Sequence, residues 1–122
     1  MVSAGKKFRE ALKNNKPLII PGAVNAYSAK LAQKAGHKAI YLSGSGVAAA
    51  SYGLPDLGVT SMEDVLIDAK RITNATSLPL LVDVDTGWGD SKSISKTIEA
   101  LVSDRLANPK KQGVINGYKK IV

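Results

Sequence analysis

The sequence predicts an α/β protein in which short parallel strands alternate with helices. Two observations support this fold class. Apolar runs of three or four residues recur between segments of helical periodicity, and these runs are apolar throughout, as in strands buried on both faces of a parallel sheet. The length of 122 residues suits one domain. It excludes a complete (β/α)₈ barrel, which needs about 200 residues or more.

The N-terminal segment predicts a helix followed by a strand. Residues 3–14 are expected to be helical, because Phe8 and Leu12 lie four residues apart and therefore on one face. The apolar run 18–20 predicts the first strand, and Pro21 with the glycine after it predicts its end.

The next segment predicts a helix, a strand and a long loop. Asn25 is a good N-cap for a helix over 26–35, and Gly36 is a good residue for ending it. Residues 39–42 predict the second strand. The stretch 43–58 is rich in glycine and is expected to be a loop.

The last clear elements are a helix, a strand and another helix. Thr60 and Glu63 have the spacing of a capping box for a helix over 61–74. Residues 80–82 predict the third strand, and residues 92–102 predict the helix that follows.

The composition restricts the classes of function. The chain has no cysteine, which excludes disulfides, thiolate zinc sites and a Cys nucleophile, and which fits a reducing compartment. It has no apolar run of 18 residues, and its first seven residues do not resemble the start of a signal peptide. We therefore expect a cytoplasmic protein without a membrane-bound segment.

The net charge of +7 is unevenly distributed. Residues 1–38 carry +7, residues 39–102 carry −4 and residues 103–122 carry +4. A basic protein can bind nucleic acid, but one Phe and one Trp offer few stacking platforms. Solvent-facing lysines on helices explain the charge better, and we expect no nucleic-acid partner.

Chemically useful side chains follow the predicted strands, and the carboxyl ends of parallel strands are where functional groups gather. Asp83 and Asp85 come directly after strand 80–82 and, on a strand, would point to the same side. Two adjacent carboxylates suit Mg²⁺. The alternative is that one of them caps a helix or binds loop amides.

A second group follows strand 39–42. The residues Ser43, Gly44 and Ser45 are small enough to let amides and hydroxyls approach a small anion, and Tyr41 lies on the same side of the chain as Ser43. The stretch 44–49 also fits the G-x-G-x-x-A dinucleotide fingerprint, although that motif needs a helix to open at once. A simple structural turn is the third interpretation.

Three other residues deserve a hypothesis. Asp56, in the loop after this group, would orient a hydroxyl or the metal shell, or would only stabilise a turn. His37 enters strand 39–42 from the opposite end and is not expected to be catalytic. Trp88 is expected to pack its loop rather than to line a pocket.

Together these segments resemble the isocitrate lyase/phosphoenolpyruvate mutase superfamily and, within it, the 2-methylisocitrate lyases. The resemblance covers about residues 4–102 and rests on four motifs in the expected order. The motifs are Gly22–Ala26, Ala39–Ala48, Gly53–Gly58 and Pro79–Gly89.

The resemblance implies a (β/α)₈ TIM barrel, a homo-oligomer, and Mg²⁺-dependent cleavage of 2-methylisocitrate to pyruvate and succinate in the methylcitrate cycle of propionate catabolism. Mg²⁺, or Mn²⁺ in its place, would hold the oxygens of this tricarboxylate substrate. Asp83 and Asp85 match the metal ligands of the family. The residues that match its substrate-binding positions are Ser43, Gly44, Ser45, Tyr41 and Asp56.

The chain departs from the family after about residue 102. The family continues into another strand and a Lys-x-Cys-Gly-His loop that supplies the acid/base cysteine, whereas this chain has no cysteine. We therefore expect residues 1–102 to be the N-terminal part of a barrel, truncated after about the fourth helix, and residues 103–122 to be a divergent basic tail. No catalytic residue is assigned. The alternatives are another lyase of the phosphonopyruvate or oxaloacetate type, and a non-catalytic fragment that acts by subunit association.

Overall fold

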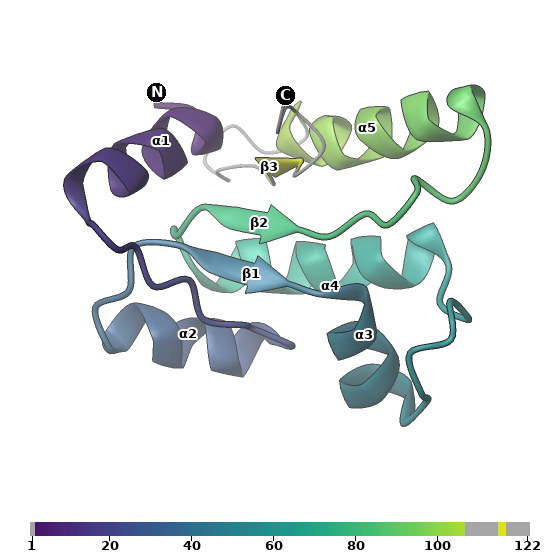
Figure 1. Cartoon of the computed structure of the whole chain (residues 1–122), viewed down its shortest axis with the longest axis horizontal. Helices are drawn as coiled ribbons and strands as arrows, with labels where there is room; N and C mark the ends of the chain where they lie inside the picture. The colour runs from purple at the N-terminus through teal and green to yellow at the C-terminus, as the bar shows by residue number, and fades with distance from the viewer. Residues whose placement is uncertain (1, 107–114, 117–122) are drawn as a thin grey trace.

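The computed structural model describes residues 2–106 and 115–116. It is an α/β structure built on a three-stranded parallel sheet in the order β1 (Ile40–Leu42), β2 (Leu80–Val82) and β3 (Ile115–Asn116) (Figure 1). The helical segments are α1 (Ala4–Asn14), α2 (Ala26–Lys34), α3 (Gly44–Val47), the π-helical turn η1 (Ala48–Tyr52), α4 (Met62–Ala75) and α5 (Ser91–Leu106).

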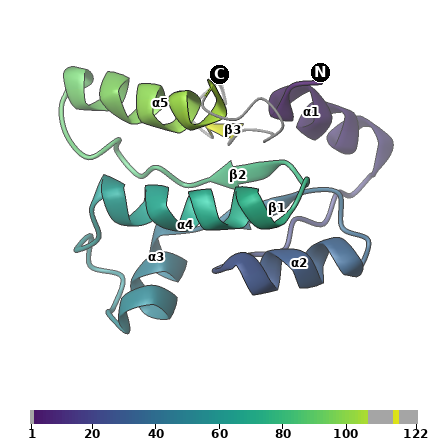
Figure 2. The same ribbon diagram turned by 180° about the vertical axis from the view of Figure 1, so that it is seen from behind.

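The main helices pack on one face of the sheet. Helix α4 lies behind β1 and β2 in Figure 1 and in front of them in Figure 2, where the molecule is seen from behind. Helix α4 contacts both α2 and α5. The parallel strands and the helices between them confirm the predicted α/β class.

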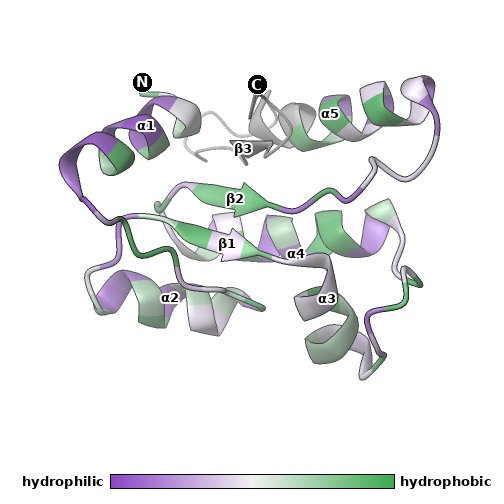
Figure 3. Ribbon diagram, in the orientation of Figure 1, coloured by the Kyte–Doolittle hydropathy of each residue, from purple (hydrophilic) through white to green (hydrophobic). Residues whose placement is uncertain are grey.

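The core lies between the sheet and α4. Strand residues Ile40, Leu42, Leu80 and Val82 are buried against the helical side, while Tyr41 and Leu81 are only half-buried. Strands β1 and β2 are mostly green, and thus hydrophobic, in Figure 3, because they supply the centre of this core. In the register of β1 and β2, Tyr41 lies opposite Leu81, so the carboxyl ends of the two strands lie side by side.

The predicted limits of the second helix are confirmed. The Ser28 amide donates a hydrogen bond to the Asn25 side chain at 2.8 Å. In return, the Asn25 amide donates to the Ser28 hydroxyl at 3.1 Å. These two bonds satisfy amides that the first helical turn leaves unpaired. Gly36 has φ +88°, the left-handed conformation that favours glycine after a helix.

The prediction of a strand at 18–20 is wrong, because the paired segment lies further along the chain. Gly22 forms a parallel bridge to Tyr41. The Ala23 amide donates to the Tyr41 carbonyl at 2.8 Å, and the Tyr41 amide donates to the Pro21 carbonyl at 3.0 Å. Proline lacks an amide hydrogen, but this edge position uses only its carbonyl. Pro21 and Gly22 therefore belong to the segment that pairs with β1, and they do not mark the end of a strand at 18–20.

The prediction of a loop over 43–58 is wrong in its first part. A helical segment begins at Gly44 and continues as η1 to Tyr52. Alanines at 48–50 favour helix, and the first-turn amides of a helix need no backbone acceptor, so the early glycines are tolerated. Gly53, with φ +65°, ends the segment and the true loop begins there.

The predicted capping box is displaced by one residue. Ser61 is the N-cap of α4, and its partner is Asp64 rather than Glu63. Both pairs have the same spacing, so the sequence alone could not separate them.

Helix α5 continues to Leu106, past the predicted end at residue 102. Of the predicted basic tail 103–122, residues 107–114 and 117–122 lie outside the described residues. Within the described part of the chain, no helix is both long and apolar enough to cross a bilayer.

Candidate functional site

The predicted site residues of two strands meet at the carboxyl ends of β1 and β2. The Asp83 amide donates to the Leu42 carbonyl at 2.9 Å, which extends the strand pairing by one residue. The Tyr41 hydroxyl donates to Asp83 Oδ2 at 3.1 Å. Tyr41 on the neighbouring strand β1 therefore fixes the position of the Asp83 carboxylate.

Asp83 and Asp85 also meet, but not by the alternation of a strand. Strand β2 ends at Val82, and Asp85 adopts the left-handed conformation with φ +45°. This turn brings the Asp85 amide to 3.0 Å from Asp83 Oδ1, to which it donates. Aspartate tolerates this backbone conformation better than most residues.

Gly44 allows the Asp85 carboxylate to approach the turn that follows β1. A Cβ atom added at Gly44 would lie 3.4 Å from Asp85 Oδ2. A larger side chain at this buried position would reach the carboxylate. The structure thus places Gly44 directly beside Asp85, as the grouping of the predicted substrate and metal residues requires.

The hydroxyl groups of the same turn complete the polar surface. The Ser43 and Ser45 Oγ atoms lie 2.8 Å apart and share a hydrogen bond. Burial and the charge of Asp83 raise the pKa of Tyr41. A hydrogen bond between Ser43 and the Tyr41 hydroxyl lowers this pKa, but by less, so the net shift is upward. Tyr41 therefore remains a neutral hydrogen-bond donor near neutral pH.

The site carries an excess of negative charge. Burial raises the pKa of Asp85, and the charges of Asp83 and Asp56 raise it further. Asp56 lies in the loop that follows η1. Among the residues whose side chains the structure describes, none donates a hydrogen bond to the Asp85 carboxylate. A cation would relieve the repulsion between these groups.

The donor set fits a hard cation such as Mg²⁺ or Mn²⁺, which prefers oxygen ligands, better than a metal that prefers nitrogen or sulfur ligands. The described residues contain no group of three or more His, Cys, Asp or Glu side chains that could enclose a metal ion. Mg²⁺ binds through one or two carboxylates and keeps several waters. Asp83 and Asp85, whose carboxylate accepts no hydrogen bond from the described side chains, meet that requirement.

The helix at Gly44 bears on the dinucleotide interpretation of residues 44–49. Contrary to expectation, a helix opens directly after β1, as the fingerprint requires. Helix α3 spans only four residues before it widens into the π-helical turn. The fingerprint therefore remains an untested alternative.

Two further expectations concern Trp88 and His37. The Trp88 indole packs beside Met62 and Leu101, and its Nε1 donates to the Thr60 carbonyl at 3.1 Å, so the expected packing role is confirmed. His37 donates its amide to the Ala32 carbonyl at the end of α2. It precedes β1, at the opposite end of the strand from Asp83.

Sequence reasoning missed the side chains that anchor η1 to α4. The Ser51 hydroxyl donates to Asp68 Oδ2 at 2.5 Å, and the Tyr52 hydroxyl donates to Asp64. Asp68 is 3% exposed. The available signal was an aspartate among the apolar residues Val65, Leu66 and Ala69 of the predicted helix, because a buried carboxylate needs partners.

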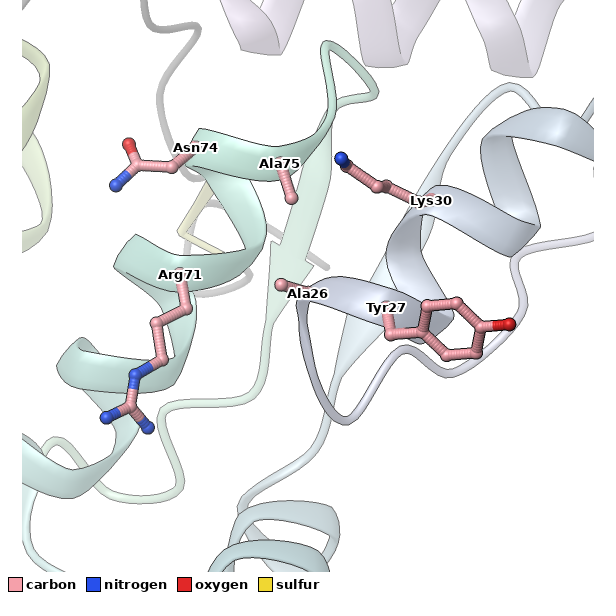
Figure 4. Close-up of a pocket in the computed structure, with 6 residues that line it drawn as sticks. All are labelled: Ala26, Tyr27, Lys30, Arg71, Asn74 and Ala75. Carbon is pink, nitrogen blue, oxygen red and sulfur yellow. The ribbon is translucent and has the colours of Figure 1, made fainter.

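One surface depression among the described residues lies apart from this site. It lies between α2 and α4 and is lined by residues that include Tyr27, Lys30 and Arg71 (Figure 4). Arg71 forms an ion pair with Asp68 at 3.2 Å. The depression is thus on the helical side of the sheet, away from the acidic pair.

Comparison with known proteins identifies relatives for most of the chain. The sequence profile of the family described as phosphoenolpyruvate phosphomutase matches residues 8–108. A 2-methylisocitrate lyase of Shewanella oneidensis is 66% identical over 97 residues, which are 80% of this chain and 33% of the relative. A 2-methylisocitrate lyase of Bacillus subtilis is 40% identical over 123 aligned positions, which cover 94% of this chain and 40% of the relative.

A solved structure shows the same arrangement of elements. The crystal structure of 2,3-dimethylmalate lyase, described as a member of the PEP mutase/isocitrate lyase superfamily, matches with a TM-score of 0.74 and 35% identity. The match covers 85% of this chain and 38% of that one. The chain thus spans about a third of the length of several curated 2-methylisocitrate lyases that it matches.

Proposed function

Because the chain belongs to the phosphoenolpyruvate phosphomutase family, we propose that it carries the metal-binding part of a 2-methylisocitrate lyase. The activity of the whole enzyme would be Mg²⁺-dependent cleavage of 2-methylisocitrate to pyruvate and succinate in propionate catabolism. The identity with lyases of that name supports this substrate.

The sheet would form part of a larger parallel barrel. In such barrels the active site lies at the carboxyl ends of the strands. The same ends carry Tyr41, Ser43 and Asp83 in this chain. The topology and the position of the polar residues therefore support a partial (β/α)₈ barrel.

In this proposal the side chains divide into two roles. Asp83 and Asp85 would hold Mg²⁺, which when bound supplies positive charge to polarise substrate oxygens. Ser43, Gly44 and Ser45 would bind a substrate carboxylate through hydroxyl and amide groups. Tyr41 orients Asp83 through its 3.1 Å hydrogen bond. Asp56 would orient a substrate hydroxyl or the shell of the metal ion.

One observation carries the proposal: two carboxylates lie together beside Gly44, with excess negative charge and with the Asp85 carboxylate open to a cation. A purely structural pair would be expected to have a basic partner or a full set of amide donors. Asp83 has donors from Tyr41 and Asp85, but Asp85 has none among the described residues.

Calorimetric titration of the 122-residue chain with Mg²⁺ tests this proposal. We expect weak binding that Asp85→Asn reduces by about tenfold or more, because one of two charged ligands is lost. Asp90→Asn is the matched control. It removes one charge nearby, and asparagine still accepts the hydrogen bond that Asp90 accepts from the Ser93 amide. Equal affinity in both variants and the parent chain would refute the proposed metal site.

A second candidate is a lyase that acts on another dicarboxylate, such as a substrate of the oxaloacetate or phosphonopyruvate type. The structural match to a 2,3-dimethylmalate lyase favours keeping this candidate. Protection of the Mg²⁺-loaded chain against thermal unfolding would separate the two. Stronger protection by 2-methylisocitrate than by oxaloacetate or dimethylmalate would support the first, and the reverse order would support the second.

A further inference from the structure

Asp68 is a buried carboxylate that the proposed chemistry does not use. It is 3% exposed, and among the described residues it is the one acidic side chain in the buried class. Its neighbours on this face of α4 are Val65, Ala69 and Ile72, which are buried and apolar. A charged group in such surroundings costs free energy unless other groups bind it. The partners of Asp68 therefore indicate its role.

The two partners of Asp68 lie at different distances along the chain. Arg71, one helical turn further along α4, forms an ion pair with Asp68 Oδ1 at 3.2 Å, and its side chain is 66% exposed. Ser51 lies 17 residues before Asp68, on η1, and its hydroxyl donates to Asp68 Oδ2 at 2.5 Å. The ion pair is thus local to α4, whereas the bond from Ser51 connects α4 to another element.

That other element is the far end of a continuous helical rod. Helix α3 and η1 follow each other without a break over residues 44–52, which we call the α3–η1 rod. The Ala48 amide at the junction donates to two carbonyls of α3, so the hydrogen bonding continues across it. The rod begins directly after Ser43 of the candidate site, and the loop with Asp56 follows its other end. A constraint on Ser51 therefore acts on both groups.

Two contacts set the direction of the α3–η1 rod. Near its start, a Cβ atom added at Gly46 would lie 3.0 Å from Val24 Cγ1, so the rod packs closely against the segment before α2. Near its end, Ser51 is bound to Asp68. A rod that is fixed at two points keeps its orientation, whereas a rod fixed at one point can pivot.

A second hydrogen bond joins η1 to α4, from the Tyr52 hydroxyl to Asp64. Tyr52 is 51% exposed. Water competes for exposed hydrogen bonds, whereas a bond to a buried carboxylate is costly to break because the carboxylate would be left without its partner. The bond from Ser51 to Asp68 is therefore the stronger constraint on the end of the rod.

We propose that Asp68 is a positioning residue of the candidate site. By holding Ser51 it fixes the far end of the α3–η1 rod, and it thereby sets where the Ser43–Ser45 turn and the loop with Asp56 lie relative to the acidic pair. Asp68 itself would touch neither the metal ion nor the substrate. The effect on ligand affinity rests on the proposed function, because it requires that the turn binds substrate.

Two-dimensional NMR of the unliganded 122-residue chain tests the positioning. Ser51→Ala and Asp68→Asn should both shift the amide signals of residues 43–45 and 56, because the rod loses its far anchor. Ser51 is exposed, so its substitution leaves the core intact even where Asp68→Asn fails to fold. Ser51→Thr keeps the hydroxyl and should restore the parent signals.

Thr73→Val is the matched control for these spectra. Thr73 is also a buried polar residue of α4, but its hydroxyl donates to the Ala69 and Lys70 carbonyls of the same helix. The signals of residues 43–45 should therefore stay in place in this variant. Shifts in Ser51→Ala that are confined to the surroundings of residues 51 and 68, or equal shifts at 43–45 in Thr73→Val, would overturn the proposal.

Binding measurements separate positioning from a general loss of structure. In Ser51→Ala the Mg²⁺ affinity should stay within about twofold of the parent value, because the acidic pair follows β2 and not the rod. Protection of the Mg²⁺-loaded chain against thermal unfolding should require about tenfold more 2-methylisocitrate, since displaced binding groups lose much of their effect. A parent chain that binds neither ligand would refute the proposed function, and the amide shifts would still decide whether Asp68 positions the rod. Equal weakening of both affinities, or no change in either, would overturn the positioning role.

Discussion

The backbone of the loop between Asp83 and Gly89 determines where the Asp85 carboxylate lies. Asp85, Gly87 and Trp88 all have positive φ values, of +45°, +82° and +59°. The Thr97 hydroxyl donates to the Gly87 carbonyl at 3.1 Å, and Trp88 is tied to Thr60. These contacts fix the part of the loop that follows Asp85, and thereby the position of its carboxylate.

Gly87→Ala should destabilise the protein by about 1–3 kcal/mol, the usual cost of overpacking with added backbone strain. The new Cβ would lie 2.5 Å from Ile94 Cγ1, and alanine disfavours the φ of +82°. Urea unfolding measures the effect. Gly5→Ala within α1 is the control and should be neutral or slightly stabilising. Equal stability of the Gly87 variant and the parent chain would show that the loop adopts another conformation.

At the scale of elements, the connection between β1 and α4 positions the residues around Asp56. Segment η1 is joined to α4 through Ser51 with Asp68 and Tyr52 with Asp64. Asp64 also accepts hydrogen bonds from the Ser61 amide and hydroxyl, both at 2.7 Å. One carboxylate therefore caps the helix and anchors the preceding segment.

The stability that Asp64 contributes should depend on pH. Its pKa is lowered from the ordinary value of 3.8, first by the hydrogen bond from Tyr52 and then by those from Ser61. A lowered folded-state pKa gives stability that is present above the unfolded value and is lost as pH falls through the folded value. The Tm difference between the parent chain and Asp64→Asn should therefore be constant near neutral pH and should shrink below about pH 4.

Glu63→Gln is the matched control, since it removes a carboxylate one residue away in the same turn. A Tm difference for Asp64→Asn that stays constant or grows as the solution is acidified would contradict the assigned role of Asp64.

Local signals predicted those elements whose capping residues and apolar pattern agree. Asn25 and Gly36 bound α2 as expected, and the run 80–82 forms β2. The exceptions depend on contacts that are distant in the sequence. Pairing with Tyr41 makes the Pro21–Ala23 segment an edge strand, and contacts with α4 stabilise the π-helical turn.

The candidate site was predictable in its residues but not in its geometry. Asp83, Asp85, Tyr41 and Ser43 do lie together. The positive φ of Asp85 and its approach to Gly44 depend on the packing of the whole loop. Side-chain identity and strand order predict which residues lie together. Only the tertiary structure defines how Asp85 is placed beside Gly44.

For the whole molecule, the proposed chemistry requires more groups than these residues supply. Cleavage of 2-methylisocitrate leaves a carbanion on succinate that must be protonated, and the resemblance assigns that proton to a cysteine that this sequence lacks. Positioned acid/base groups contribute about 10²–10⁴-fold to rate. The 122-residue chain should therefore release no pyruvate above background in the presence of Mg²⁺. Turnover that Asp85→Asn abolishes would show that another group completes the site.

The central claim is that a divalent cation binds between Asp83 and Asp85 at the carboxyl end of the sheet. The most direct measurement is a Mg²⁺ titration of ¹⁵N-labelled protein followed by two-dimensional NMR. We predict saturable shifts of the amides at 43–45, 56 and 83–87, with little change in α2, and loss of these shifts in Asp83→Asn/Asp85→Asn. Shifts distributed over the other acidic residues, or shifts that persist in that variant, would contradict the claim.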